Sequence, residues 1–368
     1  MAERRAVGES RQRGRGSRAS RIALAGLPVA LFAAALAIPI WQLSSLLGAD
    51  DWGSDWRWLE DGLQRLGAGE PLVRPEYVNG PFTQFPDGPA YTWSLHLPST
   101  ATLVAPSLLL PAALREPAWA IAMAAAVAAA AWLAWPRRLW WGTHLLVAAV
   151  VMGPLVGLSR ALVDQLHFAN PNGLVVLGVV ITWIGRRHGS VALVAGGVAL
   201  AAVKVLPAIA LAAWLLTDGR GRAVAVTALL GAAAIHVALT LPVMILDPGA
   251  LADTLAAQAN LIPWQDPSNF APAVRLAPLL GPELAAWISR LAGAALLALV
   301  ILRRLDGPGG FVLAAVAPLL LTPQLWTHWL LIPVAAALAT AGEWPSLRAL
   351  DRRLRLAWLD GTTGPSRG

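Results

Sequence analysis

Long apolar stretches alternate with short polar ones along most of the chain. The first runs from Ile22 to about Leu47 and is too long for a signal-peptide core. Eight more follow, at about 98–114, 117–135, 139–158, 173–185, 190–217, 223–246, 284–302 and 309–342. A helix needs about 20 apolar residues to cross a bilayer, and most of these stretches are close to that length. The pattern predicts an all-α polytopic membrane protein.

The composition excludes the classes of protein that work in water. Hydrophobic residues make up 57% of the chain and charged residues 13%, and the mean hydropathy is +0.59. A soluble domain carries about a quarter charged residues, so a soluble enzyme, a disordered protein and a nucleic-acid module are excluded. The net charge of +7 is explained by basic cytoplasmic loops. Because the chain has no cysteine, disulfides, thiolate metal sites and cysteine nucleophiles are excluded as well.

Basic clusters between the apolar stretches predict the orientation. They are residues 1–21, Arg137-Arg138, Arg186-Arg187, Arg220 with Arg222, Arg303-Arg304 and the segment 348–367. Placing all of them in the cytoplasm puts 20 of the 28 basic residues inside, as the positive-inside rule predicts. We therefore expect a multi-pass plasma-membrane protein with both termini in the cytoplasm. Residues 1–21 would be a disordered basic tail, 22–342 the transmembrane domain, and 343–368 a second basic tail.

This orientation constrains the number of crossings. The stretch 190–217 has both ends in the cytoplasm, so it must go out and back as two short helices that turn near Lys204–Pro207. The stretch 309–342 must do the same, with its turn at 322–328. Residues 98–114 are then re-entrant or interfacial, which gives about ten crossings; twelve is the alternative count. Two large extracytoplasmic loops result, at 49–97 and 247–283.

Unusual polar residues gather on the predicted outer side, and each has an ordinary alternative explanation. Lys204, the only lysine, lies inside an apolar stretch, where a cation indicates function unless it reaches the interface along its own stem. Asn170–Gly173 has the chemistry of a plain turn as well as that of a binding loop. His328 stands near Trp326 and Trp329, as an interfacial residue also would. His144 and His236 lie on apolar stretches and are interpreted as structural.

The types of polar residue limit the kinds of substrate and reaction that fit this chain. No acidic residue lies well inside a predicted crossing, where ion-coupled transporters place carboxylates. The chain has no glycine-rich phosphate loop and no H-E-x-x-H metal motif. Carboxylate, amide, ammonium and imidazole groups on one side of the membrane suit a substrate that carries hydroxyls and a phosphate.

Five short motifs occur in an order that resembles glycosyltransferase family 87, a GT-C family of membrane enzymes that use polyprenyl-phosphate sugars. They are Asp55 with Gly69, Phe85-Pro86 and Pro98; Asn170-Pro171-Asn172-Gly173-Leu174; Ala202–Pro207 with its Lys-x-x-Pro pattern; Ser268-Asn269; and Pro323–His328. The resemblance covers roughly residues 22–342. It implies a GT-C fold whose large first extracytoplasmic loop carries the catalytic base.

The resemblance implies a hexosyl- or pentosyltransferase. The enzyme would move mannose or arabinofuranose, with mannose preferred, from a polyprenyl-phosphate donor to an envelope glycolipid or glycan by single inverting displacement, without a cofactor or a metal. Asp55 would be the catalytic base, and Lys204 and His328 would bind the donor phosphate. The residues expected to orient the substrates are Gln165, His167, Asn170, Asn172, Asn269 and Trp326. The expected partners are this donor, this acceptor and membrane lipids, with no nucleic acid.

Two other classes stay open: a transporter or flippase of a lipid-linked sugar, and a non-catalytic membrane scaffold. The choice of base is open too, since Asp50 and Asp51 lie where the first helix would leave the membrane. The sequence predicts that Asp55 lies near the start of an amphipathic helix, where it could instead be a capping residue. On this helix a stripe of Trp58, Leu59, Leu63 and Leu66 is expected to face the membrane.

Overall fold

The computed structural model describes residues 29–35, 37–45, 53–81, 96–152, 158–219, 221–261 and 269–362. Within these ranges all the regular elements are helices, which confirms the predicted helical class. Several predicted features lie outside the described residues: the tail at 1–21, the acids Asp50 and Asp51, the Phe85-Pro86 pair and Ser268.

Among the described residues, three helices are long and apolar enough to cross a membrane: α5 (Ala112–Ala134), α11 (Arg222–Leu246) and α14 (Pro282–Leu302). A fourth is obtained if the neighbouring helices Thr327–Glu343 and Pro345–Leu356 count as one bent span. Shorter apolar helices are α6 (Trp141–Met152), α9 (Val191–Ala201), α10 (Val205–Leu215) and α15 (Pro308–Leu321). The lengths and apolar character of these helices indicate a helical membrane protein, while the count of ten crossings stays a prediction.

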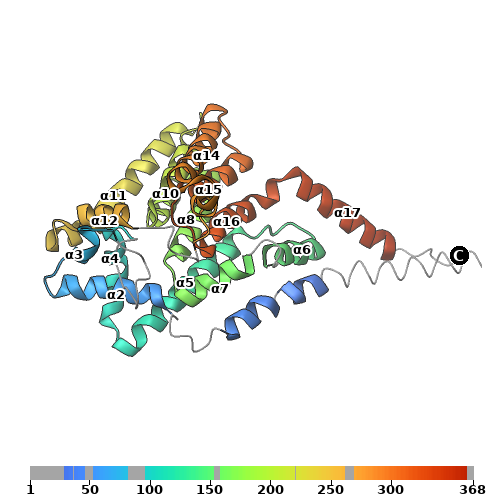
Figure 1. The fold of residues 1–368 in the computed structure, drawn as a ribbon. Helices are drawn as coiled ribbons and strands as arrows, with labels where there is room; N and C mark the ends of the chain where they lie inside the picture. Colours follow the sequence, from blue (N-terminus) through green and yellow to red (C-terminus); the bar gives the residue numbers. More distant parts are fainter. Residues whose placement is uncertain are drawn as a thin grey trace, which may run out of the picture. The chain divides into compact units, whose positions relative to one another are not determined.

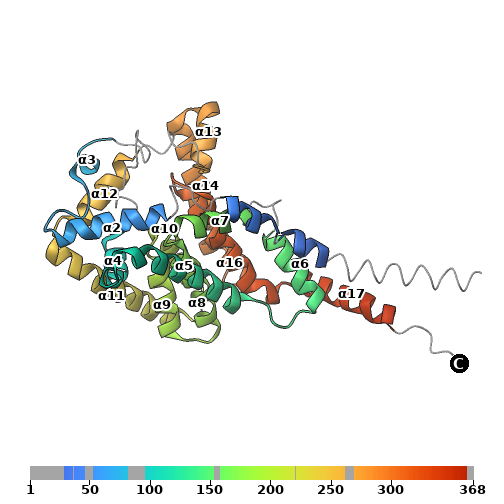
Figure 2. The same ribbon diagram turned by 90° about the horizontal axis from the view of Figure 1, so that it is seen from below.

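The chain divides into two compact units. One contains residues 1–45, 136–159 and 340–368, and the other contains residues 46–135 and 160–339, which include all the predicted site residues. In this second unit α8 (Asn172–Arg187) packs on α5 and α9, α9 packs on α11, and α10 packs on α15. The helices α2 (Ser54–Gly67), α3 (Pro75–Val78), α4 (Pro98–Val104) and α12 (Ala250–Asn260) gather at one end of it (Figures 1 and 2).

Residues 29–35 and 37–45 are helical too, and further elements lie between or after the helices named above. They are the short helix η1 (Ala105–Leu109) after α4, α7 (Leu158–Phe168), α13 (Pro272–Leu280), η4 (Thr327–Leu330), α16 (Leu331–Thr340), η5 (Ala341–Glu343) and α17 (Pro345–Thr362). In the stretch 98–114, α4 has only seven residues and is followed by the five of η1. At a rise of about 1.5 Å per residue α4 extends only about 10 Å, well short of the bilayer core.

Glycines bring α8 and α9 into close contact. A Cβ on Gly178 of α8 would lie 2.5 Å from the carbonyl oxygen of Gly197 on α9. A Cβ on Gly197 would in turn lie 2.5 Å from Oγ1 of Thr182. Helices in membranes associate through such small-residue contacts because apolar burial gives little driving force in lipid. The packing fixes the end of α9, which leads directly to Lys204.

The helix α2 forms where the sequence predicts it, but its apolar stripe does not face the membrane. Leu59, Leu63 and Leu66 are buried in a core cluster that also contains Trp119 of α5, and Trp58 is buried too. The expectation of a membrane-facing stripe is therefore wrong. Helical periodicity shows that one face is apolar, and it does not distinguish lipid from protein as what covers that face.

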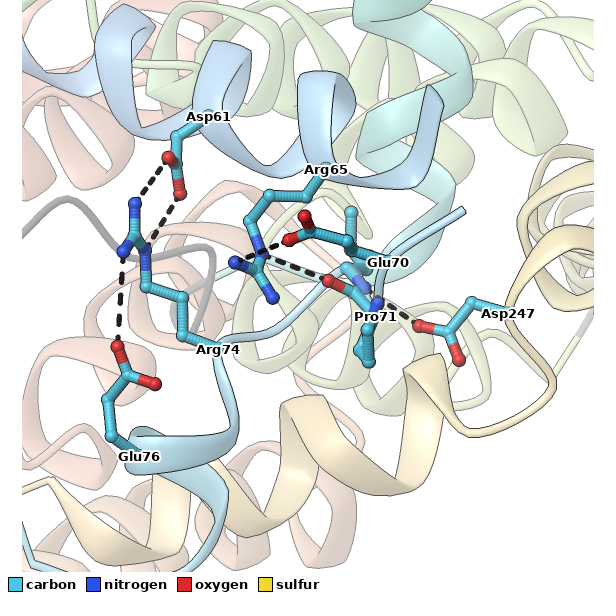
Figure 3. A network of polar contacts seen from close by, with 8 residues as sticks. Asp61, Arg65, Glu70, Pro71, Arg74, Glu76 and Asp247 are labelled. Atoms are coloured by element: carbon cyan, nitrogen blue, oxygen red, sulfur yellow. Dashed lines mark hydrogen bonds and ion pairs between the residues drawn. The ribbon is translucent and has the colours of Figure 1, made fainter. Parts of the chain in front are cut away.

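Ion pairs and hydrogen bonds connect the polar residues of the segment 61–76 with one another and with Asp247 (Figure 3). The guanidinium of Arg74 donates to both carboxylate oxygens of Asp61, at 3.1 and 2.5 Å. Arg65 pairs with Glu70 at 3.0 Å, and its Nε donates to the carbonyl oxygen of Pro71. The backbone N–H of Leu72 donates to the Asp247 carboxylate at 2.8 Å. These contacts hold the end of α2, the segment that follows it and the start of the 247–283 loop together.

In the other unit the predicted basic tail at 343–368 is helical over α17, which the sequence analysis missed. Trp358 of α17 packs against Trp140 and Trp141, with ring centroids 5.8 and 5.5 Å away. The carboxylate of Asp351 accepts a hydrogen bond from the backbone N–H of Trp140 at 2.8 Å. This part of the chain is therefore a packed amphipathic helix.

Candidate functional site

Asp55 lies in the first turn of α2 and is 6% exposed. The helix begins at a left-handed Gly53 (φ 67°), whose N–H donates to the carbonyl oxygen of His167 at 2.8 Å. The residue that caps α2 is Gly53, and no side chain caps the helix. Asp55 therefore does not cap α2, although the sequence left that role open. Its carboxylate points instead toward the turn that joins α7 to α8.

That turn holds Asp55 through Asn170. The side-chain N–H of Asn170 donates to Oδ2 of Asp55, and its Oδ1 accepts from the backbone N–H of Asn172 at 2.8 Å. The backbone carbonyl of Asn170 accepts from the Gln165 side chain at 2.5 Å. Both ends of the Asn170 amide are thus engaged, so its orientation toward the carboxylate is fixed.

The same turn is built on an uncommon backbone conformation. Ala169 has φ 52°, a left-handed geometry that costs a non-glycine residue about 1–2 kcal/mol. Its carbonyl oxygen accepts a hydrogen bond from the buried indole N–H of Trp119 at 2.8 Å. This contact from α5 helps to offset the cost, and it keeps Asn170 aimed at Asp55.

Lys204 comes from the break between α9 and α10. Pro207 cannot donate to the carbonyl of Val203, so α9 cannot continue through it, and α10 starts afresh at Val205. Lys204 at the break is buried. Its Nζ lies 3.5 Å from Nε2 of His328 and 4.2 Å from the ring centre of Trp329, in cation–π contact.

His328 is placed by the loop that follows α15. This helix ends before Pro323, because the residue before a proline avoids helical geometry. His328 is buried in η4, and its carbonyl oxygen accepts from the Asn172 side chain at 2.8 Å. The ring of Trp326 stacks on the His328 ring with centroids 6.1 Å apart and planes 17° apart.

Burial and nearby charge set the protonation of Asp55. Removal from water raises the pKa of its carboxyl from the ordinary value to about 6. The hydrogen bond from Asn170 and the positive charge of Lys204 favour the carboxylate and limit this rise. Asp55 and Lys204, from segments about 150 positions apart in the chain, therefore lie near enough for their charges to interact.

The structure groups most of the predicted site residues. Asp55, Gln165, Asn170, Asn172, Lys204, Trp326 and His328 are linked by the contacts above. Two others have different surroundings. His167 contributes its backbone carbonyl to Gly53, and its ring packs on Phe168 with centroids 4.7 Å apart. The Asn269 side chain accepts from the N–H of Leu325 and donates to the carbonyl of Pro323, each at 2.9 Å, so its geometry favours holding a loop.

Sequence analysis missed His96, Asp164 and Thr327 as site residues. His96 is buried just before α4, where burial and the charge of Lys204 lower its pKa to about 3. The only sequence signal for it is its position two residues before Pro98 of the first-loop motif. Asp164 is buried, and its carboxylate accepts a hydrogen bond from the Thr327 hydroxyl. Nothing in the sequence pairs these two residues.

In this cluster, two buried amide oxygens lack a hydrogen-bond partner among the described residues: Oε1 of Gln165 and Oδ1 of Asn172. The amide N–H groups of both side chains are engaged with backbone carbonyls, which fixes the orientation of the amides. A buried acceptor without a donor costs about 1–3 kcal/mol, so such atoms suit a ligand that supplies O–H groups.

In the described part of the chain no group of three or more His, Asp or Glu residues could hold a metal ion. The prediction of a metal-free reaction stays untested.

Comparison with protein-family models, with curated proteins and with solved structures found no match for this chain.

Proposed function

We propose that this chain is a membrane glycosyltransferase of the GT-C type, which moves a sugar, preferably mannose, from a polyprenyl-phosphate donor to an envelope glycolipid or glycan. The observation that carries the proposal is one buried cluster in which a carboxylate, an ammonium group and an imidazole come from three separate segments. Asp55, Lys204 and His328 supply these groups, and two unpartnered amide oxygens belong to the same cluster.

Asp55 is the general base of the proposed reaction. The acceptor hydroxyl attacks the anomeric carbon of the donor sugar and loses its proton to the Asp55 carboxylate. A pKa of about 6 leaves most of the carboxyl ionised at neutral pH and able to take a proton. Asn170 holds the carboxylate through a neutral amide, which orients it without neutralising its charge.

Lys204 and His328 bind the leaving phosphate. The bond between the anomeric carbon and the phosphate oxygen breaks as the new glycosidic bond forms, and the electron pair leaves on polyprenyl phosphate. Negative charge develops on that phosphate, where fixed donors stabilise it most effectively. Lys204 Nζ and His328 Nε2, 3.5 Å apart, are close enough to contact one phosphate group together.

The proposal also explains why the enzyme would be embedded in a membrane. The prenyl tail of the donor must stay in lipid while its phosphate reaches a polar site. We place the site on the extracytoplasmic face, with about ten crossings, the 49–97 loop outside and both termini in the cytoplasm. The three helices long enough to span a bilayer and the basic clusters support this arrangement.

The test is transfer by the purified protein. Labelled polyprenyl-phosphate mannose and polyprenyl-phosphate arabinofuranose would each be added with envelope lipid extracts, and labelled glycolipid would be quantified. We expect product from the mannose donor, with free polyprenyl phosphate released in equal amount. Movement of intact donor across a proteoliposome membrane without transfer would instead identify a flippase.

A further inference from the structure

The loop that carries His328 has few hydrogen bonds of its own. Residues 322–326, between α15 and η4, form no helix, and η4 is a single turn of four residues. Backbone groups in such a loop need partners from elsewhere when they are buried. The position of the His328 ring beside Lys204 therefore depends on groups outside the loop.

The first end of this loop is held by Asn269 and Phe270. Asn269 binds the backbone of Pro323 and Leu325 through its side chain, and the N–H of Phe270 donates to the carbonyl of Leu325 at 2.6 Å. These contacts end two residues before Thr327. They do not explain how the second end, with His328, is fixed.

The second end is held by the segment 164–172. The Asn172 side chain donates to the carbonyl oxygen of His328, and Asp164 accepts a hydrogen bond from the hydroxyl of Thr327, the residue next to His328. Asp164 is 5% exposed and Thr327 is 9% exposed, so water does not compete effectively for this bond. A hydrogen bond to a charged acceptor is about twice as strong as one between neutral groups.

Asp164 has its own charge partner. Nε of Arg160, one turn earlier on α7, lies 2.6 Å from Oδ1 of Asp164, which leaves Oδ2 to Thr327. The Arg160 side chain is 49% exposed. A carboxylate paired with a cation at Oδ1 and bonded to a hydroxyl at Oδ2 is suited to hold a neighbouring element in place.

From these contacts we propose that Asp164 and Thr327 are positioning residues, which hold the His328 imidazole beside Lys204 so that both contact the donor phosphate. The activity part of this inference rests on the proposed function. The structural part is independent of it, because it concerns only the mobility of the His328 loop.

The test compares Thr327→Val with Thr327→Ser in the full-length protein. Valine keeps the branched shape and lacks the hydroxyl, whereas serine keeps the hydroxyl. We expect hydrogen exchange of the backbone amides at 322–330 to be about tenfold faster in Thr327→Val, and within about threefold of wild type in Thr327→Ser. Adding Asp164→Asn to Thr327→Val should produce little further change in exchange at 322–330, since the bond between residues 164 and 327 is already absent in the valine variant.

Transfer kinetics provide the second measurement. In Thr327→Val, KM for polyprenyl-phosphate mannose should rise on the order of tenfold while KM for the acceptor stays unchanged. A loss of folded protein alone would change neither KM. Thr327→Ser should restore the donor KM.

Equal exchange at 322–330 in Thr327→Val and wild type would overturn the inference. Equally fast exchange, or an equally raised donor KM, in the serine and valine variants would overturn it too. If wild-type protein transfers no sugar from any polyprenyl-phosphate donor, the proposed function is wrong, and the exchange measurement still decides the role of Asp164 and Thr327.

Discussion

Two carboxylates on α2, six residues apart, have contrasting surroundings. Asp61 is partly exposed and is bound by both arms of the Arg74 guanidinium (Figure 3). Asp55 is buried, accepts a hydrogen bond from the neutral amide of Asn170 and lies near Lys204. One helix thus presents a surface ion pair and a buried carboxylate within two turns.

The difference shows how surroundings separate a structural acid from a reactive one. A bidentate arginine engages both oxygens of its partner in charge-assisted hydrogen bonds and fixes the position of the carboxylate. An amide orients a carboxylate without neutralising it, while burial favours the protonated form and makes the group more basic. Asp61 therefore suits anchoring of the first loop, and Asp55 suits proton transfer.

The largest effect is expected from Asp55→Asn, with Asp61→Asn as its matched control. Asparagine keeps the shape of the side chain but cannot take a proton. General-base catalysis contributes about 10²- to 10⁴-fold, so transfer should fall by that factor in Asp55→Asn and change little in Asp61→Asn. Initial rates with labelled donor, at equal amounts of inserted protein, measure this. Similar rates for the two variants would remove the distinction between these acids.

Lys204→Ala and His328→Ala should come next. Each removes one donor to the phosphate, and a charge-assisted hydrogen bond corresponds to about tenfold to a hundredfold. Donor affinity and turnover, measured by titration with polyprenyl-phosphate mannose, should fall while the protein remains folded and inserted. Unchanged values in both variants would show that Asp55 faces a lysine and a histidine with no role in the reaction.

A smaller effect is expected at Gly173, which follows the Asn170–Asn172 turn. A Cβ there would lie 2.8 Å from the backbone oxygen of Met123, so Gly173→Ala must shift the turn that holds Asp55. Overpacking of this kind costs about 1–3 kcal/mol, and transfer should fall several-fold with it. Gly196→Ala on α9 is the control, since a Cβ there meets nothing within 4 Å. Thermal unfolding and transfer rates of the two variants test this, and equal values would show that the turn tolerates displacement.

The smallest effect should follow Arg74→Ala. A partly exposed ion pair contributes about 1 kcal/mol or less, so the melting temperature should fall slightly and transfer should stay within about twofold of wild type. Thermal unfolding at low and high salt measures the electrostatic part. A loss of transfer as large as that in Lys204→Ala would place Arg74 in the reaction.

Part of this arrangement could be predicted from the sequence. Apolar stretches predicted the helices, and the basic residues at both ends of 190–217 and 309–342 predicted the turns that carry Lys204 and His328. The resemblance in the order of the motifs singled out Asp55. All three residues are in the cluster.

Other features could not be predicted, because they depend on contacts between distant segments. The apolar face of α2 packs on protein, and no periodicity distinguishes that from lipid. His96 and the Asp164–Thr327 bond have no local motif, since the partners are brought together only by tertiary folding. Asn269 has the residue type of a sugar ligand, yet its amide holds the backbone of another loop.

The most direct test of the central claim is the titration of Asp55 in wild type and in Lys204→Gln, by infrared spectroscopy of the protonated carboxyl band. Subtracting the spectra of Asp55→Asn isolates this one group from Asp164, whose pKa burial also raises. Burial puts the Asp55 midpoint at about pH 6, and the Lys204 charge holds it down. Removing that charge should therefore move the midpoint to higher pH. An identical midpoint in Lys204→Gln would contradict the claim that these two residues form one site.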